Sequence, residues 1–222
     1  MSSSLTVGRL QAGAAEAELP GAVGLHLAGE LNPRVARGAR TPLMAKALVL
    51  ANAETQLALV TLDLFGLRAE TAAALRDAIC ERCSLPPEAV MVVCSRTRGA
   101  PYTTPLVGWP GIEEGFSAGV VAQVPEVVAA AQEARAPASL GIGQAILPHL
   151  VYNHRFLTRN YKAISAPWGV PRDEILYPEG PTDPALAVLV IRDDRGRPLA
   201  LLWNCAADNR FAQDEQLSLI HI

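Results

Sequence analysis

The sequence predicts an α/β fold in which a mixed β-sheet is layered against flanking helices. Strand-length apolar runs interleave with two segments whose apolar residues recur at helical spacing. Two pairs of these runs are separated only by a short polar turn, which is the connection that joins antiparallel strands. We therefore expect a sheet that is mixed rather than purely parallel.

The elements of the first half follow from apolar spacing and from the residues that interrupt it. We expect a short strand over 5–12, a long ordered loop over 19–42, a hairpin with strands at 43–50 and 57–64, a helix over 67–83 and a strand over 90–94. Pro86 and Pro87 end the helix, because proline lacks an N–H and fixes φ.

The second half is read in the same way. We expect an irregular loop over 102–111, a helix over 113–136 that Pro125 kinks or breaks, a strand over 139–147, a loop-rich region over 151–184 and a hairpin with strands at 186–191 and 199–205. The segment Asp193-Asp194-Arg195-Gly196 has the composition of the turn in that last hairpin.

Composition bounds the class of protein. Half of the 222 residues are hydrophobic and 18% are charged, which is ample for a packed core and unlike a disordered chain. A net charge of −3 without a basic stripe argues against a nucleic-acid partner. No apolar run is long enough to span a bilayer, and the first residues do not form a secretory leader. We expect a cytoplasmic protein without a transmembrane segment.

The segment 90–101 is an apolar strand that runs into a polar loop, and loops at strand ends are where scaffolds place chemistry. Arg96 and Arg98 alternate there, so in an extended backbone both guanidinium groups point to the same side. Two fixed positive charges attract an anion and repel a metal cation. Either they clamp a carboxylate, phosphate or sulfate, or they pair with internal acids such as Asp63 and Asp208.

Eight short segments then occur in a characteristic order: 7–8, 27–29, 41–50, 59–67, 95–101, 153–155, 180–184 and 202–208. In this order the chain resembles the N-terminal catalytic domain of the neutral/alkaline (non-lysosomal) ceramidase family, which has many bacterial members, up to about Phe211. The resemblance implies the fold of that domain. It also implies a hydrolase of the sphingolipid pathway, because the family's zinc amidases cleave the N-acyl bond of ceramide.

The chain departs from that family at its zinc-binding motifs. The family loop Ser-His-Thr-His-Ser-Gly-Pro, whose first His binds zinc, reads Ser95-Arg96-Thr97-Arg98-Gly99-Ala100-Pro101 here. At a later family motif whose His is another ligand, Asp208 stands in the ligand position. Because a guanidinium stays protonated and cannot ligate, we expect no zinc and no other cofactor, with Asp208 the only residual metal ligand.

The resemblance also suggests further residues for the site. A family Asn-Arg segment that lines the active-site mouth matches either His154 or Arg155. By the family pattern Asp63 ends a strand at the same sheet edge as Cys94. The candidate residues for binding a substrate or an anion are therefore Arg96, Arg98, Arg155, His154 and Asp63. The family's serine nucleophile and its remaining zinc ligands are expected beyond the end of this chain.

The domain boundaries follow from the same comparison of motifs. We expect 1–215 to be a ceramidase-like N-terminal domain that is incomplete at its C-terminus, and 216–222 to be a non-native tail without a turn or cap.

Three functions stay open. The first is a divergent ceramidase-like protein that has lost the usual zinc site and binds an anionic or amide-containing small molecule. The second is an active amide hydrolase with a rearranged metal site, and the third is a structural or interaction domain.

Overall fold

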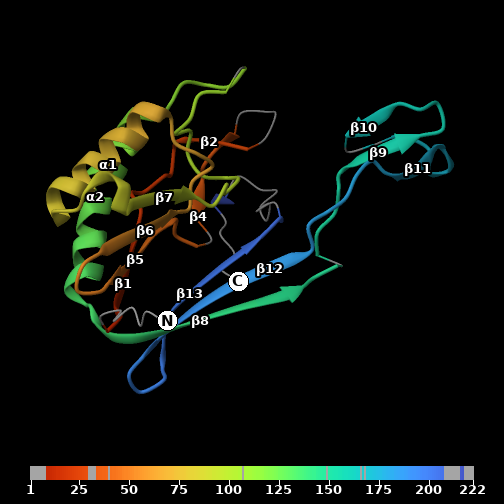
Figure 1. Cartoon of the computed structure of the whole chain (residues 1–222). Coiled ribbons are helices and arrows are strands. Elements are labelled where there is room, and N and C mark those ends of the chain that lie inside the picture. Colours follow the sequence, from red (N-terminus) through yellow and green to blue (C-terminus); the bar gives the residue numbers. More distant parts are fainter. Residues whose placement is uncertain are drawn as a thin grey trace, which may run out of the picture. The chain divides into compact units, whose positions relative to one another are not determined.

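The computed structural model describes residues 9–29, 34–39, 41–106, 108–148, 150–165, 167 and 169–207, together with the backbone of 216–217 (Figure 1). The chain divides into two compact units. The first comprises Met1–Leu140, Ile191–Ala200 and Asn209–Ile222, and the second comprises Gly141–Val190 and Leu201–Asp208.

The largest sheet has seven strands in the order β13-β12-β8-β1-β5-β6-β7. Their bounds are β1 Gln11–Glu18, β5 Met44–Ala51, β6 Gln56–Leu62, β7 Val90–Cys94, β8 Ala136–Ile146, β12 Ala185–Asp193 and β13 Pro198–Cys205. Strand β5 pairs antiparallel with β1 and β6, whereas β6 and β7 are parallel. The predicted mixed sheet is confirmed, because the β6–β7 connection is a crossover and the β5–β6 connection is a hairpin.

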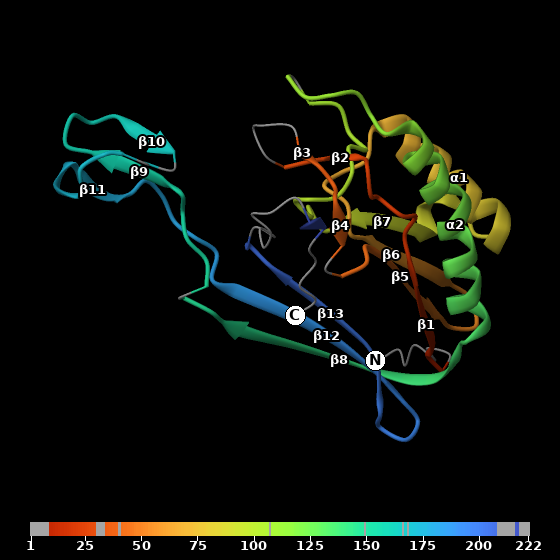
Figure 2. The same cartoon turned by 180° about the vertical axis from the view of Figure 1, so that it is seen from behind.

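Two helices cover one face of β1, β5, β6 and β7 and lie side by side there (Figures 1 and 2). They are α1, Ala69–Cys83, and α2, Glu114–Glu133. The buried residues of α1 recur every fourth position, which places them on one helical face. That face packs into a core of Leu, Val, Ile and Ala side chains contributed by both the sheet and the helices.

The helix α2 runs through Pro125, so of the kink or break expected at this residue the break is wrong. Proline costs one intrahelical hydrogen bond, but the face around it is buried against the sheet. Phe116, Val120, Val124 and Val128 are each at most 5% exposed. Burial of that apolar face stabilises the helix more than the missing hydrogen bond destabilises it.

Close packing of α2 on the sheet depends on Gly13 of β1. A β-carbon at this position would overlap Ala131 O and lie 2.7 Å from Arg135 N, both of which are backbone atoms at the end of the helix. The strand was expected at 5–12 but lies at Gln11–Glu18, and residues 1–8 are outside the described part. Its alanine-rich sequence carries little strand propensity, and pairing with β5 decides its position.

The expected long loop over 19–42 contains three short strands, which the sequence pattern did not indicate. They are β2, His26–Leu27, β3, Arg34–Val35, and β4, Gly38–Ala39. β2 pairs with β3, and β4 pairs in parallel with β14, Gln216–Leu217. Two-residue strands are too short for a detectable alternation of apolar and polar residues. Except for this backbone pairing, the expected tail at 216–222 lies outside the described residues.

The second unit holds a three-stranded sheet of order β10-β9-β11. Its strands are β9, Arg155–Thr158, β10, Ala163–Ser165, and β11, Ile175–Pro178, with a short 3-10 helix at Arg172–Glu174. The loop-rich prediction for 151–184 is confirmed in that most of the described residues there lie outside strands and helices, but it missed three short strands, and the prolines lie between or at the ends of these strands. In the part of the chain that the structure describes, no helix combines the length and apolarity needed to cross a membrane.

Candidate functional site

The loop Ser95–Pro101 leaves the sheet where two parallel strands end together. Because β6 and β7 are parallel, their carboxyl ends meet at one edge. The backbone of the loop is fixed there, since Ser95 N donates to Leu62 O at 2.9 Å and Thr97 N donates to Leu64 O at 3.0 Å. This loop, which we call the arginine loop, is therefore bonded on both sides of Arg96, to the last residue of β6 and to Leu64 just beyond it.

Asp63 holds the same edge together. Its carboxylate accepts hydrogen bonds from Met44 N at 2.9 Å and from the Ser95 hydroxyl at 3.3 Å. The Ser95 hydroxyl also lies 2.7 Å from that of Thr97. A carboxylate that joins the start of β5 to the end of β7 has a structural function, whether or not it also contacts a ligand.

Arg96 has a left-handed backbone with φ of 57°. The extended backbone from which the sequence placed both arginines on one side is therefore absent at this residue. Its side chain is exposed, and the guanidinium carbon lies 5.4 Å from the centre of the Phe65 ring. This distance is that of a cation–π contact.

Arg98 has different surroundings. Its side chain is half-buried, and Nη1 donates to Gly29 O at 2.7 Å. Gly29 has φ of 102°, and a β-carbon there would lie 2.6 Å from Arg98 Cγ. The neighbouring backbones also bond to each other, from Gly99 N to Ala28 O at 2.9 Å and from Ala28 N to Ala100 O at 2.7 Å. Arg98 therefore braces the arginine loop against the segment that follows β2.

The Phe65 ring beside Arg96 begins a series of three aromatic rings, and we call Phe65, Trp109 and Tyr102 the aromatic row. The Phe65 and Trp109 ring centres are 5.7 Å apart, and those of Trp109 and Tyr102 are 4.7 Å apart. Tyr102 is fully buried, and its hydroxyl has no hydrogen-bond partner among the described residues. Burial raises the pKa of the Tyr102 hydroxyl above its ordinary value, while Arg34 acts in the opposite direction.

Sequence reasoning missed a histidine–carboxylate pair beside this loop. Glu113, at the start of α2, accepts hydrogen bonds from the backbone N–H of His26 at 2.9 Å and from its ring Nδ1 at 3.0 Å. Tyr102 N donates to His26 O and Glu113 N donates to Tyr102 O, which joins β2, the loop and the helix. The partners are 87 residues apart, and no local pattern indicates such a pairing.

The remaining predicted residues are not brought to this loop by any described contact. His154 and Arg155 are exposed and belong to the second unit, where Arg155 forms an ion pair with Glu179. Asp208 lies outside the described residues, so the predicted pairing of Asp208 with the arginines stays a prediction.

The described residues do not fit the zinc ion that the family resemblance implies. Among them, no three His, Cys, Asp or Glu side chains form a group that could hold a metal. Arg96 and Arg98 offer only N–H donors, and a guanidinium has no lone pair for a metal. Cys94 ends β7 next to the loop, but burial raises the pKa of its thiol to about 11, which keeps it protonated at neutral pH.

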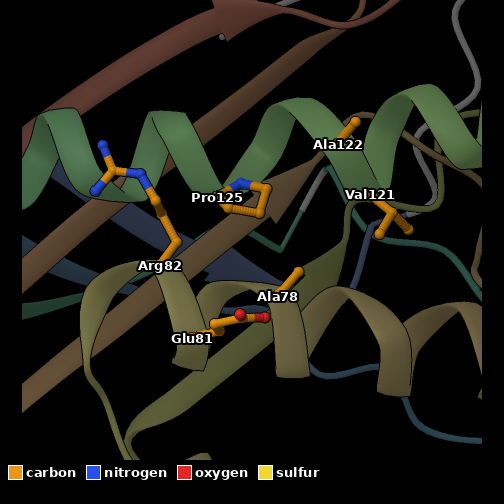
Figure 3. A pocket seen from close by; sticks show the side chains of 6 residues that line it. All are labelled: Ala78, Glu81, Arg82, Val121, Ala122 and Pro125. Carbon is orange, nitrogen blue, oxygen red and sulfur yellow. The ribbon is translucent and has the colours of Figure 1, made fainter.

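A separate groove lies between α1 and α2 (Figure 3). It is open to solvent, measures about 570 Å³ and is lined by Ala78, Glu81, Arg82, Val121, Ala122 and Pro125. The Arg82 guanidinium makes two hydrogen bonds to Glu126, at 2.8 and 3.0 Å, and these hydrogen bonds hold the pKa of Glu126 below its ordinary value. The Arg82 cation of this groove is therefore already paired with a carboxylate.

No family model and no curated protein matches the chain. Solved structures do match. A ceramidase complexed with C2 is 20% identical with a TM-score of 0.68, over 88% of this chain and 30% of that one. Neutral ceramidase from Pseudomonas aeruginosa is 18% identical with a TM-score of 0.68, over 95% of this chain and 34% of that one.

At these identities the similarity concerns the fold. The ceramidase-like α/β architecture that the sequence predicted is confirmed. The chain spans about a third of the length of the two ceramidases.

Proposed function

We propose that this chain is a ceramidase-like domain whose arginine loop binds the anionic group of a small molecule in place of a zinc ion. The observation that carries the proposal is the geometry of Arg96. An exposed guanidinium lies over Phe65 on a residue with φ of 57°, and both of its neighbours are bonded to the end of β6. Strained non-glycine residues persist where their surroundings fix them, and they concentrate at functional sites.

The chemistry of guanidinium defines the ligand. The Arg96 guanidinium carbon lies 5.4 Å from the Phe65 ring centre, and hydrogen bonds to a ligand use the N–H groups of the guanidinium. Those groups match the two oxygens of a carboxylate or a phosphate, and the charge strengthens each hydrogen bond. Arg98 adds positive charge nearby while it braces the loop through Gly29.

Calorimetric titration with acetate, phosphate and sulfate at low ionic strength tests the proposal. We expect saturable binding to the wild-type chain, at least tenfold weaker binding to Arg96→Ala, and weaker binding as salt screens the charge. Arg82→Ala is the matched control. It also removes one exposed guanidinium, but it lies at the end of α1, which is at the opposite edge of the parallel strands. Equal affinity in Arg96→Ala and wild type would exclude this site.

The fold similarity to ceramidases favours one second candidate, an amide hydrolase with a rearranged metal site. In that case Asp208 and residues outside the chain would supply the ligands that Arg96 and Arg98 lack. Metal analysis of the full-length protein purified without chelators separates the two functions. Stoichiometric zinc together with turnover of an N-acyl amide would replace the anion-binding proposal.

A further inference from the structure

We propose that the ligand of the arginine loop is an aryl carboxylate, in which the carboxylate is bonded directly to a flat aromatic ring. This inference rests on the proposed function, because it specifies the anion that Arg96 binds. It adds the aromatic row as the part of the site that recognises the uncharged half of the ligand.

The cation and the aromatic row form one continuous series of contacts. The Arg96 guanidinium lies 5.4 Å from the Phe65 ring centre, Phe65 lies 5.7 Å from Trp109, and the planes of those two rings are inclined at 55°. Tyr102 follows at 4.7 Å from Trp109 with an inclination of 58°. These tilted arrangements are favoured by aromatic quadrupoles, so the rings support one another's positions.

Exposure changes along this series. Tyr102 is fully buried and forms the inner end, whereas Phe65 and Trp109 are only half-buried. Leu106 is 40% exposed, and the chain turns there because Trp109 N donates to Leu106 O at 3.2 Å. The exposed Arg96 cation therefore contacts the half-buried Phe65 ring, from which the half-buried Trp109 follows, and this is the pattern expected for a ligand with one charged and one apolar end.

Planarity selects an aromatic ring over other apolar groups. A bidentate guanidinium–carboxylate pair is flat, and a carboxylate conjugated to a ring is coplanar with that ring. An aryl carboxylate paired with Arg96 therefore presents one flat surface, and its ring part can pack against the half-buried rings that adjoin the guanidinium through Phe65. Phosphate and sulfate are tetrahedral, and a saturated ring is puckered, so neither forms such a layer.

Calorimetric titration with benzoate, cyclohexanecarboxylate and acetate tests the inference. All three are carboxylates that are ionised at neutral pH, and the first two are similar in size. We expect benzoate to bind about three- to tenfold tighter than cyclohexanecarboxylate, which is the range of an aromatic pair. In Trp109→Leu this advantage should fall towards unity while the affinity for acetate stays unchanged. Trp203→Leu, which removes a 47% exposed tryptophan of the second unit, is the control.

The outcomes separate the inference from the function on which it rests. Acetate binding combined with equal affinities for benzoate and cyclohexanecarboxylate would overturn the aryl preference alone. Absence of binding by every carboxylate would overturn both. If circular dichroism shows Trp109→Leu to be unfolded, Phe65→Leu replaces it, because leucine fills most of the volume without a π face. An unchanged preference for benzoate in Phe65→Leu would also contradict the inference.

Discussion

Replacement of Gly29 by alanine tests how the arginine loop is braced. The native φ of 102° is one that residues with a β-carbon rarely adopt, and the new methyl group would lie 2.6 Å from Arg98 Cγ, 2.7 Å from its Cβ and 3.0 Å from its Cα. The last of these is a backbone atom. The overlap can therefore be relieved only by separating two chain segments that the backbone bonds of Ala28 hold together.

The magnitude follows from three terms. An L-residue in a left-handed conformation costs about 1–2 kcal/mol. Overpacking costs about 1–3 kcal/mol, and the reduced entropy of the unfolded chain returns about 0.4–1 kcal/mol. We expect Gly29→Ala to lower the free energy of unfolding by about 2–4 kcal/mol. Arg98→Ala should also be destabilising, by about 1–3 kcal/mol, because it leaves the Gly29 carbonyl without its bond at 2.7 Å.

Urea unfolding followed by far-UV circular dichroism measures both changes. The signal reports on α1 and α2, which belong to the same unit as Gly29. Gly21→Ala is the control, because a β-carbon at Gly21 meets no atom within 4 Å and its φ is not in the left-handed range. The reasoning would be refuted by a Gly29→Ala variant that is as stable as Gly21→Ala.

Two further predictions concern the sheet and the half-buried thiol of Cys94. Gly13→Ala places a methyl group onto backbone atoms of Ala131 in α2 and of Arg135 just after it, and we expect a loss of at least about 3 kcal/mol in the free energy of unfolding in the same assay. A loss below about 1 kcal/mol would contradict the close approach. Burial raises the pKa of the Cys94 thiol from 9.0 to about 11 in the folded state. As the pH rises above 9, the thiol therefore ionises first in the unfolded chain. The contribution of Cys94 to the free energy of unfolding is complete below pH 9 and falls as the pH rises towards 11. Native Cys94 should therefore react with iodoacetamide at pH 8 far more slowly than in denaturant, as mass spectrometry can measure, and equal rates would contradict its burial.

The sequence by itself determined the elements whose cause is local. Helical spacing in α1, the strand-length apolar runs and the polar turns of the two hairpins predicted the mixed α/β fold, because each of these signals lies within about twenty residues. The motif order around Ser95–Pro101 also identified the ceramidase-like architecture. Short strands such as β2 and β3 carried no such signal. The first strand was predicted too early in the chain, because its position at Gln11–Glu18 depends on pairing with β5.

Only the tertiary structure decided the geometry of the site. Alternation in sequence placed Arg96 and Arg98 on one side, but hydrogen bonds to the end of β6 hold Arg96 in a left-handed conformation. Arg98 meets Gly29 across 69 residues, and His26 meets Glu113 across 87. Contacts at such separations are selected by the packing of the whole unit, since no single segment contains both partners. The residue types therefore specify the chemistry that this loop can perform, whereas the fold determines which arginine faces solvent and which braces the loop.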